Sequence, residues 1–165
     1  MLMDLIVSQG TAAAPADRHL DGAGFHSPAR SFRHNGRVIR AAGTDLVDVE
    51  RFRGYLERVN RLSERLFTPD ELAACVGRPE SLAARLAAKE AVLKALGSAC
   101  AEQGIEAPQG WSYQEVEVTS APGTAPRLEL DGVVASTARD LGIGHWYLSL
   151  GHDGGMALAF VVAAA

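Results

Sequence analysis

One segment of the chain carries charged side chains at a spacing suited to metal and phosphate chemistry. It runs from Arg85 to Lys94 and reads RLAAKEAVLK. Glu90 and Lys94 are four residues apart, so on a helix they lie on one face. Lys89 falls within a stripe of leucines, where a lysine must extend to solvent or meet an anion. The simpler interpretation is a surface Glu–Lys pair on an alanine-rich helix.

A second candidate is an aspartate within an apolar stretch. Asp45 stands between Gly43-Thr44 and Leu46-Val47. A carboxylate in such a place is costly unless it is paired or ligates a metal. The alternative is a carboxylate that caps the chain or turns it at the end of a strand.

A third candidate lies near the C-terminus, where His152 and Asp153 precede two glycines. Asp-Gly and Gly-Gly are the turn chemistry of a tight hairpin. Both side chains then have an ordinary interpretation as polar turn residues. Imidazole and carboxylate groups are also the side chains that most often transfer protons in enzymes.

The composition excludes several classes of function. The chain has 165 residues, enough for one domain, with 47% hydrophobic and 22% charged residues, as in globular proteins. Its net charge of −4 argues against nucleic-acid binding. No apolar run approaches the ~20 residues of a membrane span, and the start lacks the basic region of a signal peptide. We therefore expect a cytoplasmic protein with no membrane or nucleic-acid partner.

The pattern of apolar and turn residues predicts an α+β fold with a largely antiparallel sheet. We expect a flexible N-terminal extension over 1–36 and a single domain over 37–165. Gly97 is expected to end the third helix. The predicted elements are a strand over 37–49 that could break at Gly43, helices over 51–66, 69–76 and 81–96, strands over 111–119 and 127–131, a helix over 133–141, and strands over 146–150 and 156–162.

Together the three segments resemble the 4′-phosphopantetheinyl transferase superfamily, and within it the holo-[acyl-carrier-protein] synthase branch. That branch typically shows G-[IT]-D at the end of a strand, then [RW]-x-A-x-K-E-A-x-x-K-A-x-G on a helix, then S-[LI]-S-H. The resemblance covers about residues 38–163. Gly151 departs from the pattern, because the family usually has Ser or Thr before the histidine, and a contact with coenzyme A could be lost. The matching segments are Gly43–Asp45, Arg65–Leu72 (F-T-x-x-E-L), Arg85–Gly97 and Ser149–His152.

The resemblance implies a magnesium-dependent transferase. It would move 4′-phosphopantetheine from coenzyme A to a serine of an apo acyl carrier protein in fatty acid or polyketide biosynthesis, releasing adenosine 3′,5′-bisphosphate. Asp45 and Glu90 would hold Mg²⁺, which prefers carboxylates, water and substrate phosphates. Lys94 would stabilise developing negative charge. The implied coenzyme A contacts are Arg85, Lys89, Lys94 and His152.

The residues leave the proton acceptor and the exact role of the scaffold open. The serine proton would go to Glu90, to a metal-bound water, or to His152 with Asp153. Two other functions fit the same segments: a non-catalytic coenzyme A or nucleotide-binding protein, and an interaction module with structural carboxylates. The carrier protein, from a fatty-acid, polyketide or peptide synthase, is also left open.

Assembly and partner binding are further expectations. By analogy with the family, the chain is one unit of a homotrimer with active sites between subunits. Arg51, Arg58 and Arg65 recur every seven residues in the predicted helix 51–66, so they would follow one line on its surface. A positive strip of this kind suits the acidic helix of a carrier protein. The alternative is a solvated charged face.

Overall fold

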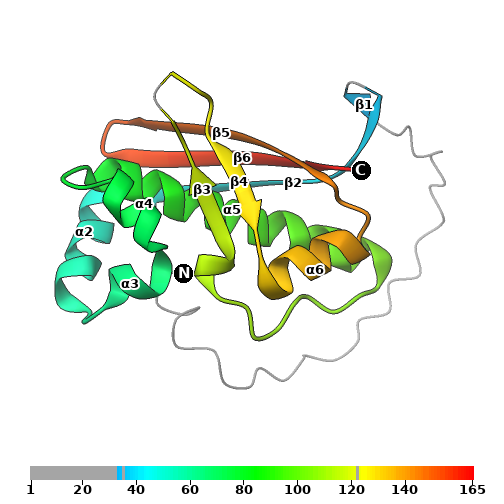
Figure 1. Ribbon diagram of the computed structural model, residues 1–165, viewed down its shortest axis with the longest axis horizontal. Helices are drawn as coiled ribbons and strands as arrows, with labels where there is room; N and C mark the ends of the chain where they lie inside the picture. The colour runs from blue at the N-terminus through cyan, green and yellow to red at the C-terminus, as the bar shows by residue number, and fades with distance from the viewer. Residues whose placement is uncertain (1–32, 35, 122) are drawn as a thin grey trace, which may run out of the picture. The chain divides into compact units, whose positions relative to one another are not determined.

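The computed structural model describes residues 33, 34, 36–121 and 123–165 (Figure 1). Most of the expected extension over 1–36 therefore lies outside the described residues. Its described part includes strand β1 (Arg33–His34), which pairs antiparallel with the start of the next strand. In the described part of the chain, no helix combines the length and the apolar character needed to cross a bilayer.

The described strands form two antiparallel sheets, one of four strands in the order β1-β2-β6-β5 and one of β3 and β4. This confirms the predicted α+β fold and the predicted C-terminal hairpin, and the predicted strands over 111–119 and 127–131 also pair antiparallel as β3 and β4. The remaining elements are β2 (Arg37–Asp48), α2 (Val49–Arg58), α3 (Leu62–Leu66), α4 (Pro69–Ala74), α5 (Pro79–Gln103), the 3-10 helix η1 (Tyr113–Glu115), β3 (Val116–Thr119), β4 (Arg127–Leu130), α6 (Gly132–Asp140), β5 (His145–Asp153) and β6 (Met156–Ala164).

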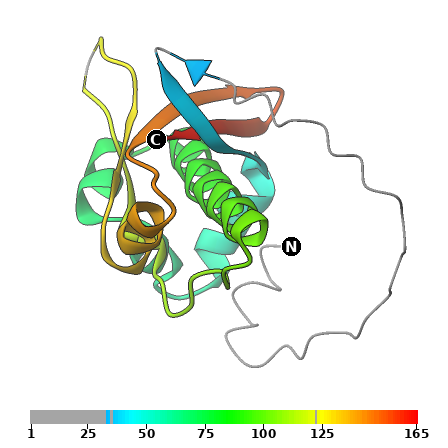
Figure 2. The same cartoon turned by 90° about the vertical axis from the view of Figure 1, so that its right-hand side faces the viewer.

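Helix α5 runs along one face of the four-stranded sheet, with the β3–β4 hairpin and α6 on its other side (Figures 1 and 2). The side chains of β6 alternate, and those facing α5 are small and buried. The approach is closest at Gly43, where an added Cβ would lie 2.0 Å from the carbonyl oxygen of Ala91. A glycine is therefore needed for β2 to lie against α5. The strand runs through Gly43 without a break.

The opposite face of the sheet presents apolar side chains to solvent. Leu46, Leu158 and Phe160 are 54%, 45% and 46% exposed. Leu46 lies directly opposite Leu158 in the β2–β6 ladder, and Phe160 is the next residue on that face. Among the described residues, no element covers these three side chains. We refer to Leu46, Leu158 and Phe160 as the outer sheet patch.

The predicted helix over 51–66 is wrong in one respect, because it is two helices. Helix α2 ends at Arg58, and Arg61 adopts a left-handed backbone conformation with φ of 57° before α3 begins. Leu62 and Leu66 are both buried after the break. The bend sends the α3 leucines into the core, and Arg65 no longer continues one helical line of arginines.

The predicted end of the long helix at Gly97 is also wrong. Helix α5 continues to Gln103 and ends at Gly104, which has φ of 66°. Ala99 and Cys100 lie beyond Gly97 and are buried. Their burial outweighs the roughly 1 kcal/mol that a glycine costs inside a helix.

The predicted strand over 111–119 begins with a helical turn instead. Ser112 and Glu115 form a reciprocal capping box around η1, and only Val116–Thr119 is a strand. Gln114 anchors this turn by donating to the carbonyl oxygen of Phe67 at 3.1 Å. The turn therefore sits fixed between the α3–α4 connection and α5.

Candidate active site

Strand β2 and helix α5 bring Asp45 and Lys94 into contact. The Lys94 ammonium donates to Asp45 Oδ1 at 2.7 Å and to the carbonyl oxygen of Thr44 at 3.3 Å. Asp45 points toward α5 because it is in register with Ala159, which is buried under that helix. The Asp45 side chain is 13% exposed and that of Lys94 40%. The pair therefore lies at the rim of the sheet–helix interface, open to solvent on one side.

Glu90 lies one helical turn before Lys94 and is half-buried. Its Oε1 accepts a hydrogen bond from the Tyr113 hydroxyl. Burial raises the pKa of Glu90, and the nearby Asp45 carboxylate raises it further, while the Tyr113 hydrogen bond and Lys94 act in the opposite direction. Two carboxylates that repel each other across β2 and α5 form a site that favours a bound cation.

The donor set at this point fits magnesium. Among the described residues, no group of three or more His, Cys, Asp and Glu side chains is placed to hold a metal. A cation between Asp45 and Glu90 would therefore have to complete its ligand shell with water and substrate oxygens. Mg²⁺ is commonly bound in this way, through one or two carboxylates plus substrate phosphates.

Lys89 is completely buried, which corrects its expected role. Its ammonium donates to Glu71 Oε2 at 2.7 Å, to the carbonyl oxygen of Tyr113 at 3.0 Å and to that of Val116. Burial lowers the pKa of Lys89, and the Glu71 carboxylate opposes that effect. Three acceptors use the three donors of the ammonium. Lys89 therefore has no exposed surface and no free N–H donor left for a coenzyme A phosphate. The anion that it binds is the Glu71 carboxylate of the same chain.

Arg85 is also nearly buried, but it keeps a spare donor. Its guanidinium donates to the Ser120 hydroxyl at 3.0 Å and to the carbonyl oxygen of Ser81 at 3.3 Å. Its Nε is buried without a hydrogen-bond partner. An unpaired buried donor is costly, so this nitrogen lowers the stability of the protein as it stands.

His152 and Asp153 occupy the exposed end of the β5–β6 hairpin. His152 is in register with Ala157 and, across β6, with Val47. His152 therefore lies two strands away from Asp45 and two residues further along the strand direction. Two strand spacings separate them by roughly 10 Å across the sheet. Within the described chain the fold does not bring His152 and Asp153 into contact with Asp45 or Glu90.

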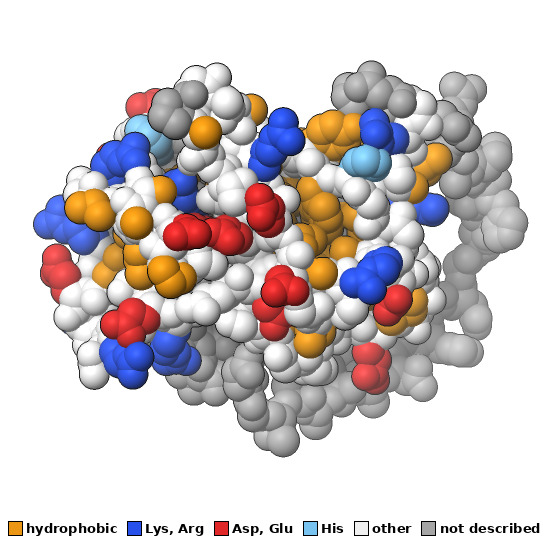
Figure 3. Space-filling model, viewed as in Figure 1, with side chains coloured by type: hydrophobic (Ala, Val, Ile, Leu, Met, Phe, Trp, Pro, Cys, Tyr) orange, Lys and Arg blue, Asp and Glu red, His pale blue; other side chains and the backbone are white. Residues whose placement is uncertain are grey.

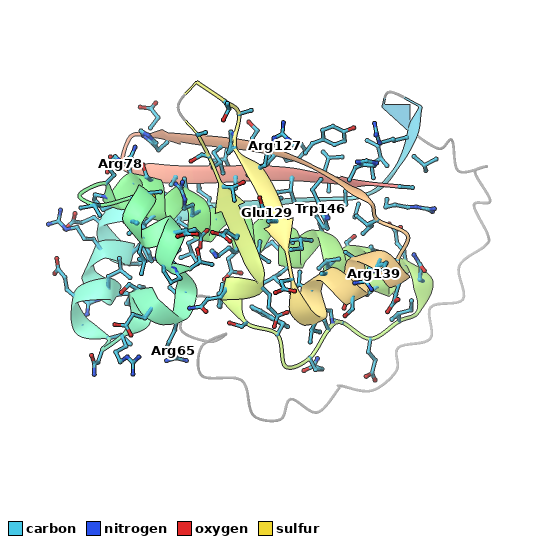
Figure 4. All side chains as sticks on the ribbon, in the orientation of Figure 1. Arg65, Arg78, Arg127, Glu129, Arg139 and Trp146 are labelled. Atoms are coloured by element: carbon cyan, nitrogen blue, oxygen red, sulfur yellow. The ribbon has the colours of Figure 1, made fainter. Side chains whose placement is uncertain are left out.

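The arginines of α2 and α3 divide into two groups. Arg53 pairs with Glu50 and Glu57, and Arg61 pairs with Glu64 at 2.6 Å. The second group is exposed and makes no ion pair with a carboxylate of the described residues. Figure 4 shows Arg65, a member of this group, pointing away from α3. The members of the second group are Arg51, Arg58 and Arg65.

A hollow of about 590 Å³ opens beside the β3–β4 hairpin and is strongly acidic. Carboxylates gather over this part of the face in Figure 3, and Glu129 on β4 is labelled in Figure 4. Its negative charge makes it unsuited to a phosphate-bearing ligand. The acidic residues that line it are Glu115, Glu117, Glu129 and Asp131.

Sequence reasoning missed two residues of the site's surroundings, Tyr113 and Glu71. Tyr113 falls within the strand predicted over 111–119 and carried no separate expectation. Glu71 was expected in the first turn of a short helix, and it does form a capping box with Thr68. No local pattern indicates that Glu71 is 1% exposed or that it pairs with a lysine 18 residues away.

Known proteins share both the sequence pattern and the fold of this chain. Residues 41–161 match the 4′-phosphopantetheinyl transferase superfamily. A holo-[acyl-carrier-protein] synthase of Frankia alni is 49% identical over 126 residues, covering 76% of this chain and 98% of that protein. One of Beutenbergia cavernae is 47% identical over 126 residues, with the same shares covered.

Solved structures agree with this assignment. The apo-ACPS structure from Chronobacterium ammoniagenes has a TM-score of 0.68 at 32% identity, covering 78% of this chain and 97% of that one. The ACPS–CoA complex from the same organism has a TM-score of 0.64 at 34% identity, covering 74% and 95%. The family expected from the motifs is confirmed: this chain belongs to the 4′-phosphopantetheinyl transferase superfamily.

Proposed function

We propose that this protein is a magnesium-dependent holo-[acyl-carrier-protein] synthase. It transfers 4′-phosphopantetheine from coenzyme A to a serine of an apo acyl carrier protein and releases adenosine 3′,5′-bisphosphate. The observation that carries the proposal is the meeting of Asp45 and Lys94 across β2 and α5, with Glu90 one turn away. The names of relatives that align over nearly their whole length support the reaction.

In this mechanism Asp45 and Glu90 would hold Mg²⁺, and the bound cation would supply charge neutralisation for the pyrophosphate of coenzyme A. Lys94 already lies against Asp45, and its partly exposed ammonium is placed to stabilise the negative charge that develops on the leaving phosphate. Arg85 stays a proposed contact for an anionic part of coenzyme A, through the small exposed part of its side chain. Lys89 takes no part in substrate contact.

The serine proton needs an acceptor, and three choices stay in the proposal. The first is the Glu90 carboxylate, which lies at the site one helical turn from Lys94. The other two are a water activated at the site, and His152 with Asp153. In one subunit the last pair makes no hydrogen bond with Glu90 among the described residues, and we propose that it acts in a site that a neighbouring copy completes.

The proposed assembly is a homotrimer with active sites between subunits. The outer sheet patch supports it, because apolar side chains that face solvent together on one surface favour association. His152, expected as a coenzyme A contact, is exposed at the end of the β5–β6 hairpin, where a neighbouring subunit could use it. We propose the cytoplasm as the location, where coenzyme A and carrier proteins are available.

The carrier protein is proposed to dock on α2 and α3. Arg51, Arg58 and Arg65 are exposed and have no carboxylate partner among the described residues, whereas Arg53 and Arg61 are neutralised by their own glutamates. The basic side chains at this end of the molecule (Figure 3) suit an acidic helix of the partner.

The decisive experiment incubates the purified protein with coenzyme A and apo carrier proteins from fatty-acid, polyketide and peptide synthases. We expect the mass of at least one carrier to increase by one phosphopantetheine group, only with Mg²⁺ present. Asp45→Asn should abolish labelling, while Asp48→Asn, which alters a cap of α2, should retain it. Coenzyme A binding without labelling of any carrier would favour a non-catalytic binding protein, and binding of neither would favour an interaction module.

A further inference from the structure

Tyr113 is held at both of its polar ends by two neighbouring residues of α5. Its hydroxyl donates to Glu90 Oε1, and its backbone carbonyl oxygen accepts from the Lys89 ammonium at 3.0 Å. Lys89 and Glu90 are consecutive in the sequence, so the tyrosine spans from the buried side of the helix to its rim. The aromatic ring also packs edge to face against Trp111, with centroids 5.0 Å apart.

The Lys89 side of this arrangement is rigid. Lys89 and Glu71 are both buried, and their ion pair measures 2.7 Å. Glu71 in turn accepts the backbone N–H groups of Thr68 at 3.0 Å and Val118 at 3.0 Å. A buried charge pair with all of its hydrogen bonds satisfied keeps one geometry, because breaking it leaves an uncompensated charge. Helix α4, strand β3 and helix α5 are thus tied together around the turn that carries Tyr113.

The Glu90 side of the arrangement has an alternative partner. Lys94 lies one turn away on α5, the spacing at which Glu–Lys pairs form on helices. In the structure Lys94 bonds to Asp45 instead, and the Tyr113 hydroxyl takes one oxygen of Glu90. The other oxygen, Oε2, accepts no hydrogen bond within the described residues and is left for a cation.

We propose that Tyr113 is a positioning residue, whose hydroxyl holds the Glu90 carboxylate away from Lys94 and directs its second oxygen toward the metal that it shares with Asp45. The proposal rests on the proposed magnesium site and adds a residue to it. The buried Lys89–Glu71 pair serves this same end, since it fixes the backbone of Tyr113 from the other side of α5. Tyr113 touches neither substrate nor metal and acts through Glu90.

The test replaces Tyr113 by Phe, which keeps the ring and its contact with Trp111 and removes only the hydroxyl. We expect the Mg²⁺ concentration that gives half-maximal carrier labelling to rise about tenfold, the size of one lost hydrogen bond to a charged group. At saturating Mg²⁺, kcat should return close to the wild-type value. The control is Tyr55→Phe, which removes a tyrosine hydroxyl from α2. This variant should leave the Mg²⁺ dependence unchanged.

Direct metal binding gives a readout that needs no carrier protein. Mn²⁺ binding in the presence of coenzyme A, followed by electron paramagnetic resonance, should weaken in Tyr113→Phe by about the same factor. An unchanged Mn²⁺ affinity would overturn the proposal, as would a loss of kcat that Mg²⁺ does not restore. If the wild type binds Mn²⁺ but labels no carrier, the proposed function fails while the role of Tyr113 is still decided by this measurement.

Discussion

At the scale of single residues, the site combines one exposed and one half-buried charge on the same helix. Lys94 reaches solvent, while Glu90 loses part of its hydration and lies near a second carboxylate. Without a cation this is an unfavourable place for a negative charge. The neighbouring carboxylates therefore lower the stability of the metal-free protein and raise its affinity for a cation.

The raised pKa of Glu90 has a predictable effect on stability. Between the ordinary glutamate pKa and the raised pKa of Glu90, the native protein keeps a proton that the unfolded chain has lost. The free energy of unfolding contributed by this group therefore falls as pH rises through that window. Glu90→Gln should remove this dependence, so that the metal-free variant gains stability over the wild type from acidic to neutral pH.

Urea unfolding at a series of pH values with a chelator present measures this effect. The two proteins should have similar stability at the acidic end of the series, where Glu90 is protonated in both the folded and the unfolded wild type. Parallel curves with a constant difference would show that Glu90 does not titrate differently in the folded state.

At the scale of elements, the position of Asp45 depends on how closely β2 approaches α5. Gly43→Ala would place a Cβ 2.0 Å from the carbonyl oxygen of Ala91 and 3.0 Å from the amide nitrogen of Ala95. Both are backbone atoms, so the strand has to shift. We expect a loss of about 2–3 kcal/mol in the free energy of unfolding. The Mg²⁺ concentration needed for half-maximal activity should rise, because Asp45 moves with the strand.

Gly97→Ala provides the matched control for urea denaturation. Gly97 lies inside α5, and an added Cβ would meet no atom within 4 Å apart from its chain neighbours and the backbone of its own helix. Alanine there should stabilise the protein by about 0.5–1 kcal/mol, because glycine is a poor helix residue. The same substitution thus has opposite signs at two glycines, and destabilisation of equal size at both would contradict the packing explanation.

The arginines of α2 and α3 give a second prediction at this scale. Arg58→Glu with Arg65→Glu should raise the KM for the carrier about tenfold or more while the KM for coenzyme A stays the same. Arg53→Glu with Arg61→Glu makes an equal change in net charge at residues already paired with glutamates, and should have a much smaller effect. Equal losses for both substrates, or for both double variants, would contradict a specific docking surface.

At the scale of the whole molecule, the outer sheet patch predicts a dependence of activity on assembly. Leu158→Glu with Phe160→Glu places charges on a face that the proposed trimer buries. We expect multi-angle light scattering to change from three times the 17.4 kDa subunit mass to the subunit mass, with loss of carrier labelling and a preserved circular dichroism spectrum.

Val76→Glu is the control for that change. Val76 is the most exposed large apolar residue described, at 80%, and it lies between α4 and α5 rather than on the sheet. This variant should remain trimeric and active. A wild-type protein that is monomeric and fully active would contradict the proposed assembly.

The sequence by itself determined the family, the α+β class and most of the order of the elements, apart from the break between α2 and α3 and the helical turn η1. Repeating patterns of apolar residues are local, and so are the caps at Thr68 and the glycines of the last hairpin, so these features can be predicted without the fold. The metal pair Asp45 and Glu90 came from motif order along the chain, since each carboxylate alone has an ordinary structural interpretation.

Only the tertiary structure decided which charges meet. Lys89 and Lys94 are alike in sequence, yet the packing of α4 and β3 buries the first against Glu71, while Asp45 on β2 binds the second. The length of α5 beyond Gly97 was likewise decided by tertiary packing, because Ala99 and Cys100 are buried there. A buried lysine requires partners from several elements, and those partners are specified by long-range contacts that no local pattern contains.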